Sequence, residues 1–85
     1  MNANYVIVNK REDGSNTVQL TDDRGVILPY MAVIQPEAHG EWKGVICHIG
    51  TMGVKRRIRK VMPNAKAAIK ISTEEIKEVT QEQMT

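Results

Sequence analysis

Residues 50–62 have the sequence GTMGVKRRIRKVM, and the fold expected for the chain depends on this stretch. Before it, apolar residues alternate with polar ones or form short β-branched runs, as strands do. Within it, four apolar residues recur at helical spacing, namely Val54, Ile58, Val61 and Met62. At 100° per residue they lie within an arc of about 100° on a helix surface. The spacing therefore predicts a helix over residues 54–62 that packs through this arc.

A fifth strand is the competing interpretation of residues 54–62. Strict alternation along a strand would place Arg56 and Lys60 on the same face as apolar side chains, so the helix fits the pattern better. The expected helix ends at Pro63, which cannot donate a backbone hydrogen bond. On that helix Arg56, Arg59 and Lys60 point away from the core, and Lys55 and Arg57 lie on its flanks.

Four short strands are expected before this helix, at residues 5–8, 17–21, 26–35 and 45–49. Glycine with polar neighbours marks the turns between them. Pro29 lies inside the third strand, where it would remove a ladder hydrogen bond. This strand is therefore either at an edge of the sheet or bent into two pieces. Together the four strands predict an antiparallel β-meander, in a small sheet or a partly open barrel.

Two short elements are expected after Pro63. Residues 67–71 are predicted as a last strand. Ser72 and Glu75 match a capping box, with Ser72 as the N-cap of a short C-terminal helix. The whole pattern indicates a single α+β domain over residues 1–85: a four-stranded antiparallel β-meander, a basic helix, a short strand and a short C-terminal helix.

Length and composition limit the class of protein. Eighty-five residues provide one small core, and association into a homo-oligomer would help to stabilise it. The single cysteine, Cys47, cannot form an internal disulfide and is typical of a reducing compartment. No apolar run approaches the roughly 20 residues needed to span a bilayer, and the N-terminus lacks a signal-peptide pattern. We therefore expect a cytoplasmic protein with no membrane segment.

Charge is segregated along the chain. Residues 1–41 contain three basic and six acidic residues, and residues 74–85 contain one lysine and four glutamates. Residues 42–73 contain eight basic residues and no Asp or Glu, so the three segments sum to −3, +8 and −3. A positive cluster of this kind is typical of a surface that meets phosphate or an acidic partner.

The positive segment begins at a glycine-containing turn. Backbone N–H groups in a turn between a strand and a helix can approach a phosphate, and the helix start adds partial positive charge. The candidate nucleic-acid-binding residues are therefore Gly50, Gly53, Lys55, Arg56, Arg57, Arg59 and Lys60, with Lys66 and Lys70 extending the positive field.

The sequence Ile49-Gly50-Thr51-Met52-Gly53 resembles the Ile-Gly-x-x-Gly loop of the KH family of RNA-binding domains. The resemblance implies that this loop contacts the nucleic-acid backbone. It covers only this short stretch, and it departs from the family in two ways. A helix leads into the loop in KH domains, whereas residues 44–49 are predicted as a strand here. A position that is apolar in the family is Arg56 here. The chain is therefore not assigned to the family.

Other clusters of reactive side chains favour structural roles. His39, Cys47 and His48 lack the spacing of a zinc site, and neighbours in a strand point to opposite faces. The same geometry argues against a Cys–His nucleophilic pair. Tyr30 and Trp42 are too few for a base-stacking platform, and a core role for Trp42 is the simpler interpretation. We expect no cofactor, no metal and no catalytic residues.

The sequence thus predicts a small, non-enzymatic nucleic-acid-binding module with low sequence specificity, for DNA or RNA. Phosphate contacts give affinity without sequence information. The alternative is a protein-interaction module, such as a small regulator, inhibitor or assembly component, that binds an acidic protein surface or self-associates. In the plainest interpretation, the basic residues form a solvated face that the acidic segment 74–85 offsets. If that segment folds back onto the basic residues, it would partly mask them.

Overall fold

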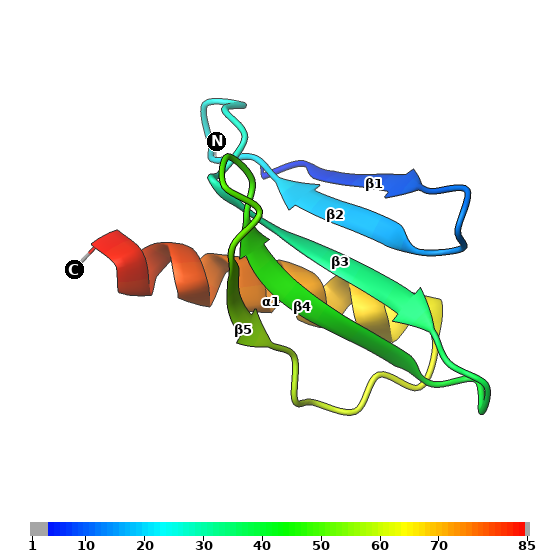
Figure 1. Cartoon of the computed structure of the whole chain (residues 1–85). Coiled ribbons are helices and arrows are strands. Elements are labelled where there is room, and N and C mark those ends of the chain that lie inside the picture. Colours follow the sequence, from blue (N-terminus) through cyan, green and yellow to red (C-terminus); the bar gives the residue numbers. More distant parts are fainter. Residues whose placement is uncertain (1–3, 85) are drawn as a thin grey trace.

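Five antiparallel strands lie side by side in the order in which they occur along the chain (Figure 1). A computed structural model describes residues 4–84. The sheet is open and one helix follows it, which confirms the α+β class, with five strands in place of the four expected. The elements are β1 (Val6–Lys10), β2 (Asn16–Leu20), β3 (Tyr30–Pro36), β4 (Trp42–His48), β5 (Val54–Arg57) and α1 (Ala65–Met84).

The first four strands occur where the sequence predicts them, with shifted ends. The predicted third strand is bent, as one of its two interpretations required. Ile27 forms an isolated bridge with Thr21, and β3 begins after Pro29, at Tyr30. Because Pro29 precedes the strand, it removes no ladder hydrogen bond from β3, which lies in the middle of the sheet.

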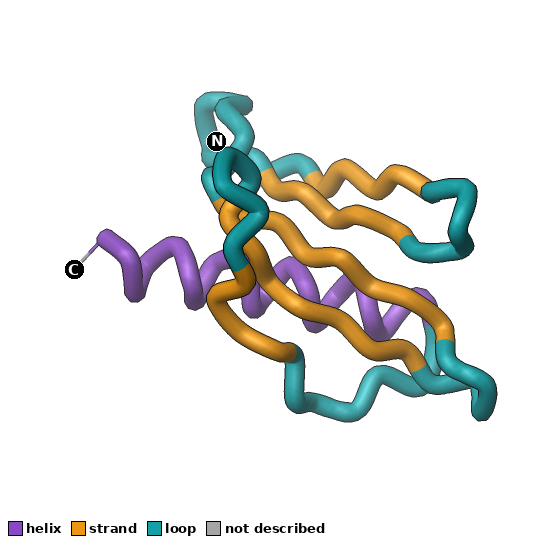
Figure 2. The backbone as a smooth tube through the Cα atoms, in the orientation of Figure 1, coloured by secondary structure: helices purple, strands orange, loops and turns teal. Residues whose placement is uncertain are grey.

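Helix α1 crosses one face of the sheet and packs against β2, β3 and β4 (Figures 1 and 2). Val18, Ala32 and Ile46 are neighbours across these three strands and lie on the helix-covered face. All three are fully buried, together with Ile76 and Val79 of α1. The core is therefore a single layer of aliphatic side chains between the sheet and the helix. The opposite face, which we call the outer face, carries no second layer among the described residues.

The helix expected over residues 54–62 is wrong. Residues 54–57 form β5, paired with β4, and residues 58–62 continue without regular structure. Ile58 and Met62 are buried because their backbones return to β4: the Ile58 N–H donates to the Gly44 carbonyl at 2.9 Å, and the Met62 carbonyl accepts from the Trp42 N–H at 2.8 Å. Val54 and Val61, in contrast, are 64% and 71% exposed. The helical spacing of Ile58 and Met62 thus arises because the backbone bonds to the edge of β4 at both residues.

Gly44 makes the close approach of Ile58 to β4 possible. A Cβ atom on Gly44 would lie 2.6 Å from Cγ2 of Ile34 and 3.2 Å from Cδ1 of Ile58. Because glycine has no side chain, Ile58 can pack across β4 into the core at this point.

The strand expected over residues 67–71 is also wrong, because these residues belong to α1. Asn64 caps the helix: the Ala67 N–H donates to Oδ1 of Asn64 at 2.8 Å. Ser72 therefore lies in the helix interior, and its predicted capping role is wrong. A run of small and aliphatic residues is compatible with a helix or a strand, but here the buried side chains continue at helical spacing through Ala68, Ser72, Ile76 and Val79.

The start of α1 at the Asn64 cap can be tested by substitution. Asn64→Ala is expected to lower the free energy of unfolding by roughly 0.5–2 kcal/mol, because it leaves a helix-terminal N–H without its acceptor. Ser72→Ala is expected to be neutral or stabilising, since Oγ of Ser72 is buried and has no hydrogen-bond partner within residues 4–84. Urea denaturation of the two variants measures both effects. A larger loss from Ser72→Ala than from Asn64→Ala would contradict the helix start.

Candidate nucleic-acid interface

The two arginines of β5 point to opposite faces of the sheet. Arg56 is paired with Ile46, whose side chain lies in the core, so Arg56 points to the helix-covered face. Arg57 is paired with Val45 and points to the outer face. Lys55 is the extra residue of a β-bulge opposite Ile46 and Cys47. Neighbouring positive charges therefore have different surroundings.

Three carboxylates of α1 surround Arg56. Nη1 of Arg56 lies 3.3 Å from Oε1 of Glu75 and 2.9 Å from Oε1 of Glu78, and Nη2 bonds to Glu82. The hydrogen bonds that Arg56 donates to Glu82 and then to Glu78 raise the pKa of its guanidinium. Nζ of Lys60 lies 3.9 Å from the other oxygen of Glu75, which is buried. We call these two cations and three carboxylates the glutamate clasp: Arg56, Lys60, Glu75, Glu78 and Glu82. It confirms that the acidic segment folds back onto part of the basic segment.

Other basic side chains in and next to β5 are not neutralised in this way. Lys55, Arg57 and Arg59 are exposed, and none has an acidic partner within 4.0 Å among residues 4–84. Lys43 lies on the outer face, as Arg57 does, with Nζ 3.5 Å from Glu37. The Lys43 side chain is 75% exposed, so this pair contributes little. We call Lys43, Lys55, Arg57 and Arg59 the outer basic patch.

The turn at Gly50–Gly53 does not offer free N–H groups to a phosphate. The N–H groups of Gly50 and Thr51 donate to Nδ1 of His48, at 3.1 and 3.2 Å. The Met52 N–H donates to the His48 carbonyl at 2.7 Å, and the Gly53 N–H donates to Oγ1 of Thr51 at 3.2 Å. No helix begins after the turn, so the expected partial positive charge is absent. The turn serves to join β4 to β5, and phosphate contact by Gly50 and Gly53 finds no support in this geometry.

The two predicted lysines beyond Pro63 lie elsewhere. Lys66 and Lys70 are exposed on the first turns of α1, whereas β5 contacts the second half of the helix through the glutamate clasp. At 1.5 Å per residue, Lys66 and Glu78 are roughly 18 Å apart along the helix axis. These lysines therefore do not extend the outer basic patch.

The remaining candidate side chains are buried or packed against other side chains. Cys47 is buried and faces outward, and burial raises the pKa of its thiol. His48 lies on the opposite face, as predicted, with its ring 5.3 Å from the Tyr30 ring in an edge-on arrangement. Tyr30 is buried and cannot stack on a base, and Trp42 packs against the core. Among residues 4–84, no three His, Cys, Asp or Glu side chains are placed to hold a metal ion.

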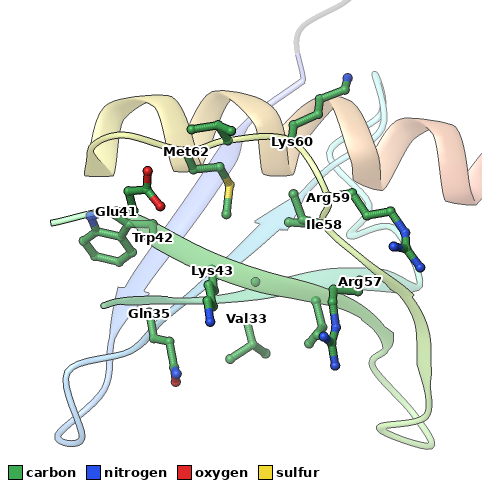
Figure 3. A pocket seen from close by; sticks show the side chains of 13 residues that line it. Val33, Gln35, Glu41, Trp42, Lys43, Arg57, Ile58, Arg59, Lys60 and Met62 are labelled. Carbon is green, nitrogen blue, oxygen red and sulfur yellow. The ribbon is translucent and has the colours of Figure 1, made fainter. Parts of the chain in front are cut away.

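A hollow of about 550 Å³ opens beside the outer basic patch (Figure 3). It lies where residues 59–61 leave the edge of β4 between the two backbone returns at Ile58 and Met62. Val33, Gln35 and Val45 line it from the outer face. No sequence motif marks these three residues as a site, although the alternation along β3 and β4 places them on one face. The lining of the hollow therefore contains both apolar side chains and cations.

Within residues 4–84, no helix is both long and apolar enough to cross a bilayer. Comparison with known proteins finds no family model, no curated protein and no solved structure that matches the chain.

Proposed function

We propose that this chain is a non-enzymatic nucleic-acid-binding module that uses the outer basic patch. The observation that carries the proposal is the division of the positive charges into two groups. Arg56 and Lys60 are paired with carboxylates of α1, whereas Lys55, Arg57 and Arg59 are exposed and have no acidic partner among the described residues. A group of exposed cations at the edge of a sheet suits the spaced charges of a phosphate backbone. Such contacts do not distinguish sequences, so low sequence specificity is expected.

The proposal predicts a face-dependent loss of affinity. Changing Lys55, Arg57 and Arg59 to Gln should weaken binding to a 20-base-pair duplex at low salt. Because each phosphate contact releases counterions, the slope of log affinity against log salt should flatten by roughly two to three units, at about 0.9 per duplex contact. Titrations at several salt concentrations measure the slope. The three side chains are exposed, so the variant should stay folded.

A matched control uses three other exposed cations. Lys10, Arg11 and Arg24 lie in the acid-rich N-terminal half of the chain. Changing them to Gln removes the same charge and should flatten the slope much less. Equal losses from the two triple variants would mean diffuse attraction without a site. No binding by the unmodified protein at low salt would overturn the proposal.

A protein-interaction role is the second candidate, and the opposite edge of the sheet favours it. Helix α1 does not cover β1, and Val6 and Val8 on that strand are 43% and 39% exposed. Tyr5, Val26 and Ile27 add exposed apolar surface beside them. An uncovered edge strand of β-branched residues can pair with another chain. A protein that self-associates in sedimentation and binds no nucleic acid would support this second candidate.

A further inference from the structure

We propose that the hollow beside the outer basic patch accepts an unpaired nucleobase, so that the protein prefers single-stranded nucleic acid to a duplex. This inference rests on the proposed nucleic-acid-binding function and adds the form of nucleic acid. The pairing of β3, β4 and β5 brings together the side chains that would contact the base. Val33 is paired with Val45, and Val45 is paired with Arg57, so the three residues form one row across the outer face of β3, β4 and β5.

The next row supplies polar groups. Gln35 is paired with Lys43, one step along the same two strands, and both residues line the hollow. Directly opposed residues in a sheet are about 4.5–5.5 Å apart, so the two valines make a small apolar floor between Arg57 and Lys43. In Figure 3 the side chains of Val33, Gln35, Lys43 and Arg57 point to the same side of β4.

The charge of the lining selects an anionic ligand. Four cationic side chains line the hollow, against one carboxylate, Glu41. Lys60 is paired with Glu75, which leaves Lys43, Arg57 and Arg59 for an anionic ligand. A flat apolar floor bordered by cations suits a nucleotide: the base would lie on Val33 and Val45, and Arg57 and Arg59 would meet the phosphates. Guanidinium groups also stack on unpaired bases. A duplex keeps its bases stacked inside and could use only the cations.

An acidic peptide suits the hollow less well. Peptides that bind at a sheet edge add a strand through main-chain hydrogen bonds. The edge of β4 is already bonded at both ends of the hollow, through the Ile58 N–H to the Gly44 carbonyl and the Trp42 N–H to the Met62 carbonyl. The outer face therefore offers side-chain contacts, which a base and its phosphate can use.

Trp42 provides the readout, because it is the only tryptophan and lines the hollow. Its fluorescence is titrated at low salt with four probes: a 12-nucleotide thymidine oligomer, an abasic oligomer of the same length, a 12-base-pair duplex and polyglutamate. One base that rests on the apolar floor should make the thymidine oligomer bind roughly 5- to 10-fold more tightly than the abasic one, because it removes apolar surface from water. The duplex should resemble the abasic oligomer, and polyglutamate should bind more weakly than the thymidine oligomer.

Two variants separate the base contact from the phosphate contacts. Val61→Ser alters an exposed residue of the lining, and the double variant Val33→Ser with Val45→Ser removes the apolar floor. Both should lower affinity for the thymidine oligomer and leave the abasic oligomer unchanged. Val26→Ser, which changes another exposed valine outside the lining, is the matched control and should change neither.

The outcomes distinguish the two proposals. Equal affinity for the thymidine and abasic oligomers would overturn the base-binding hollow and leave the nucleic-acid function standing. No binding of either oligomer or of the duplex would overturn both proposals. Polyglutamate binding at least as tightly as the thymidine oligomer would assign the hollow to an acidic protein.

Discussion

Truncation of the chain after Thr73 is expected to unfold the domain. The truncation removes Ile76 and Val79, which are 0% and 1% exposed in the core, and the buried Glu75. Loss of a single large aliphatic side chain from a core typically costs about 2–5 kcal/mol. Because a small domain has only about 5–15 kcal/mol of stability in total, losing these side chains together exceeds what the sheet can retain. Circular dichroism and thermal denaturation of residues 1–73 measure the effect.

Truncation after Thr80 is the control. It removes residues 81–85, of which residues 81–84 are all exposed, and keeps both core side chains. This shorter chain should still unfold cooperatively. A cooperative transition for residues 1–73 would mean that the second half of α1 does not complete the core. Truncation before Glu75 therefore measures folding and cannot test whether the acidic segment masks the basic residues.

Arg56→Met is expected to destabilise the protein far more than the same change at its neighbour Arg57. Methionine keeps much of the apolar stem of Arg56 but leaves the buried Glu75 carboxylate with Lys60, at 3.9 Å, as its remaining cation. Leaving a buried acceptor without its partner costs about 1–3 kcal/mol. Arg57 is exposed and has no acidic partner among residues 4–84, so Arg57→Met should change stability by no more than about 0.5 kcal/mol.

Urea denaturation of the two methionine variants gives both free energies of unfolding. Arg56→Met combined with Glu75→Met tests the cause, because replacing both members of a buried pair with apolar residues is often nearly neutral. The double variant should recover part of the loss. Equal effects of Arg56→Met and Arg57→Met would show that the glutamate clasp contributes nothing to stability.

The glutamate clasp also explains why sequence patterns predicted the wrong structure for residues 54–62. The strand interpretation seemed poor because it places Arg56 and Lys60 on the same face as Ile58 and Met62. The structure has this arrangement, and it is tolerated because carboxylates from α1 meet both cations. Those carboxylates lie 15 or more positions away along the chain, so no local pattern reveals them. A spacing of four also satisfies a helical period and strand alternation equally.

Other features were predictable because their signals are local. The first four strands follow from β-branched runs and glycine turns, and the segregation of charge was visible in the sequence. The sequence also pointed to Lys55, Arg57 and Arg59 as candidate binding residues. It did not separate them from Arg56 and Lys60, because that division depends on which face of the sheet α1 covers. The hollow was missed because Val33 and Val45 resemble core residues until the outer face is known to be uncovered.

The matching order of the strands in sequence and in space has a consequence for folding during synthesis. Each strand pairs with the next one, so the sheet can assemble through short loop closures as the chain emerges. Helix α1 follows all five strands in the sequence and supplies the other side of the core. Until it leaves the ribosome, the apolar face formed by Val18, Ala32 and Ile46 has no cover. The nascent sheet is then at its most prone to aggregation, and docking of the helix ends that exposure.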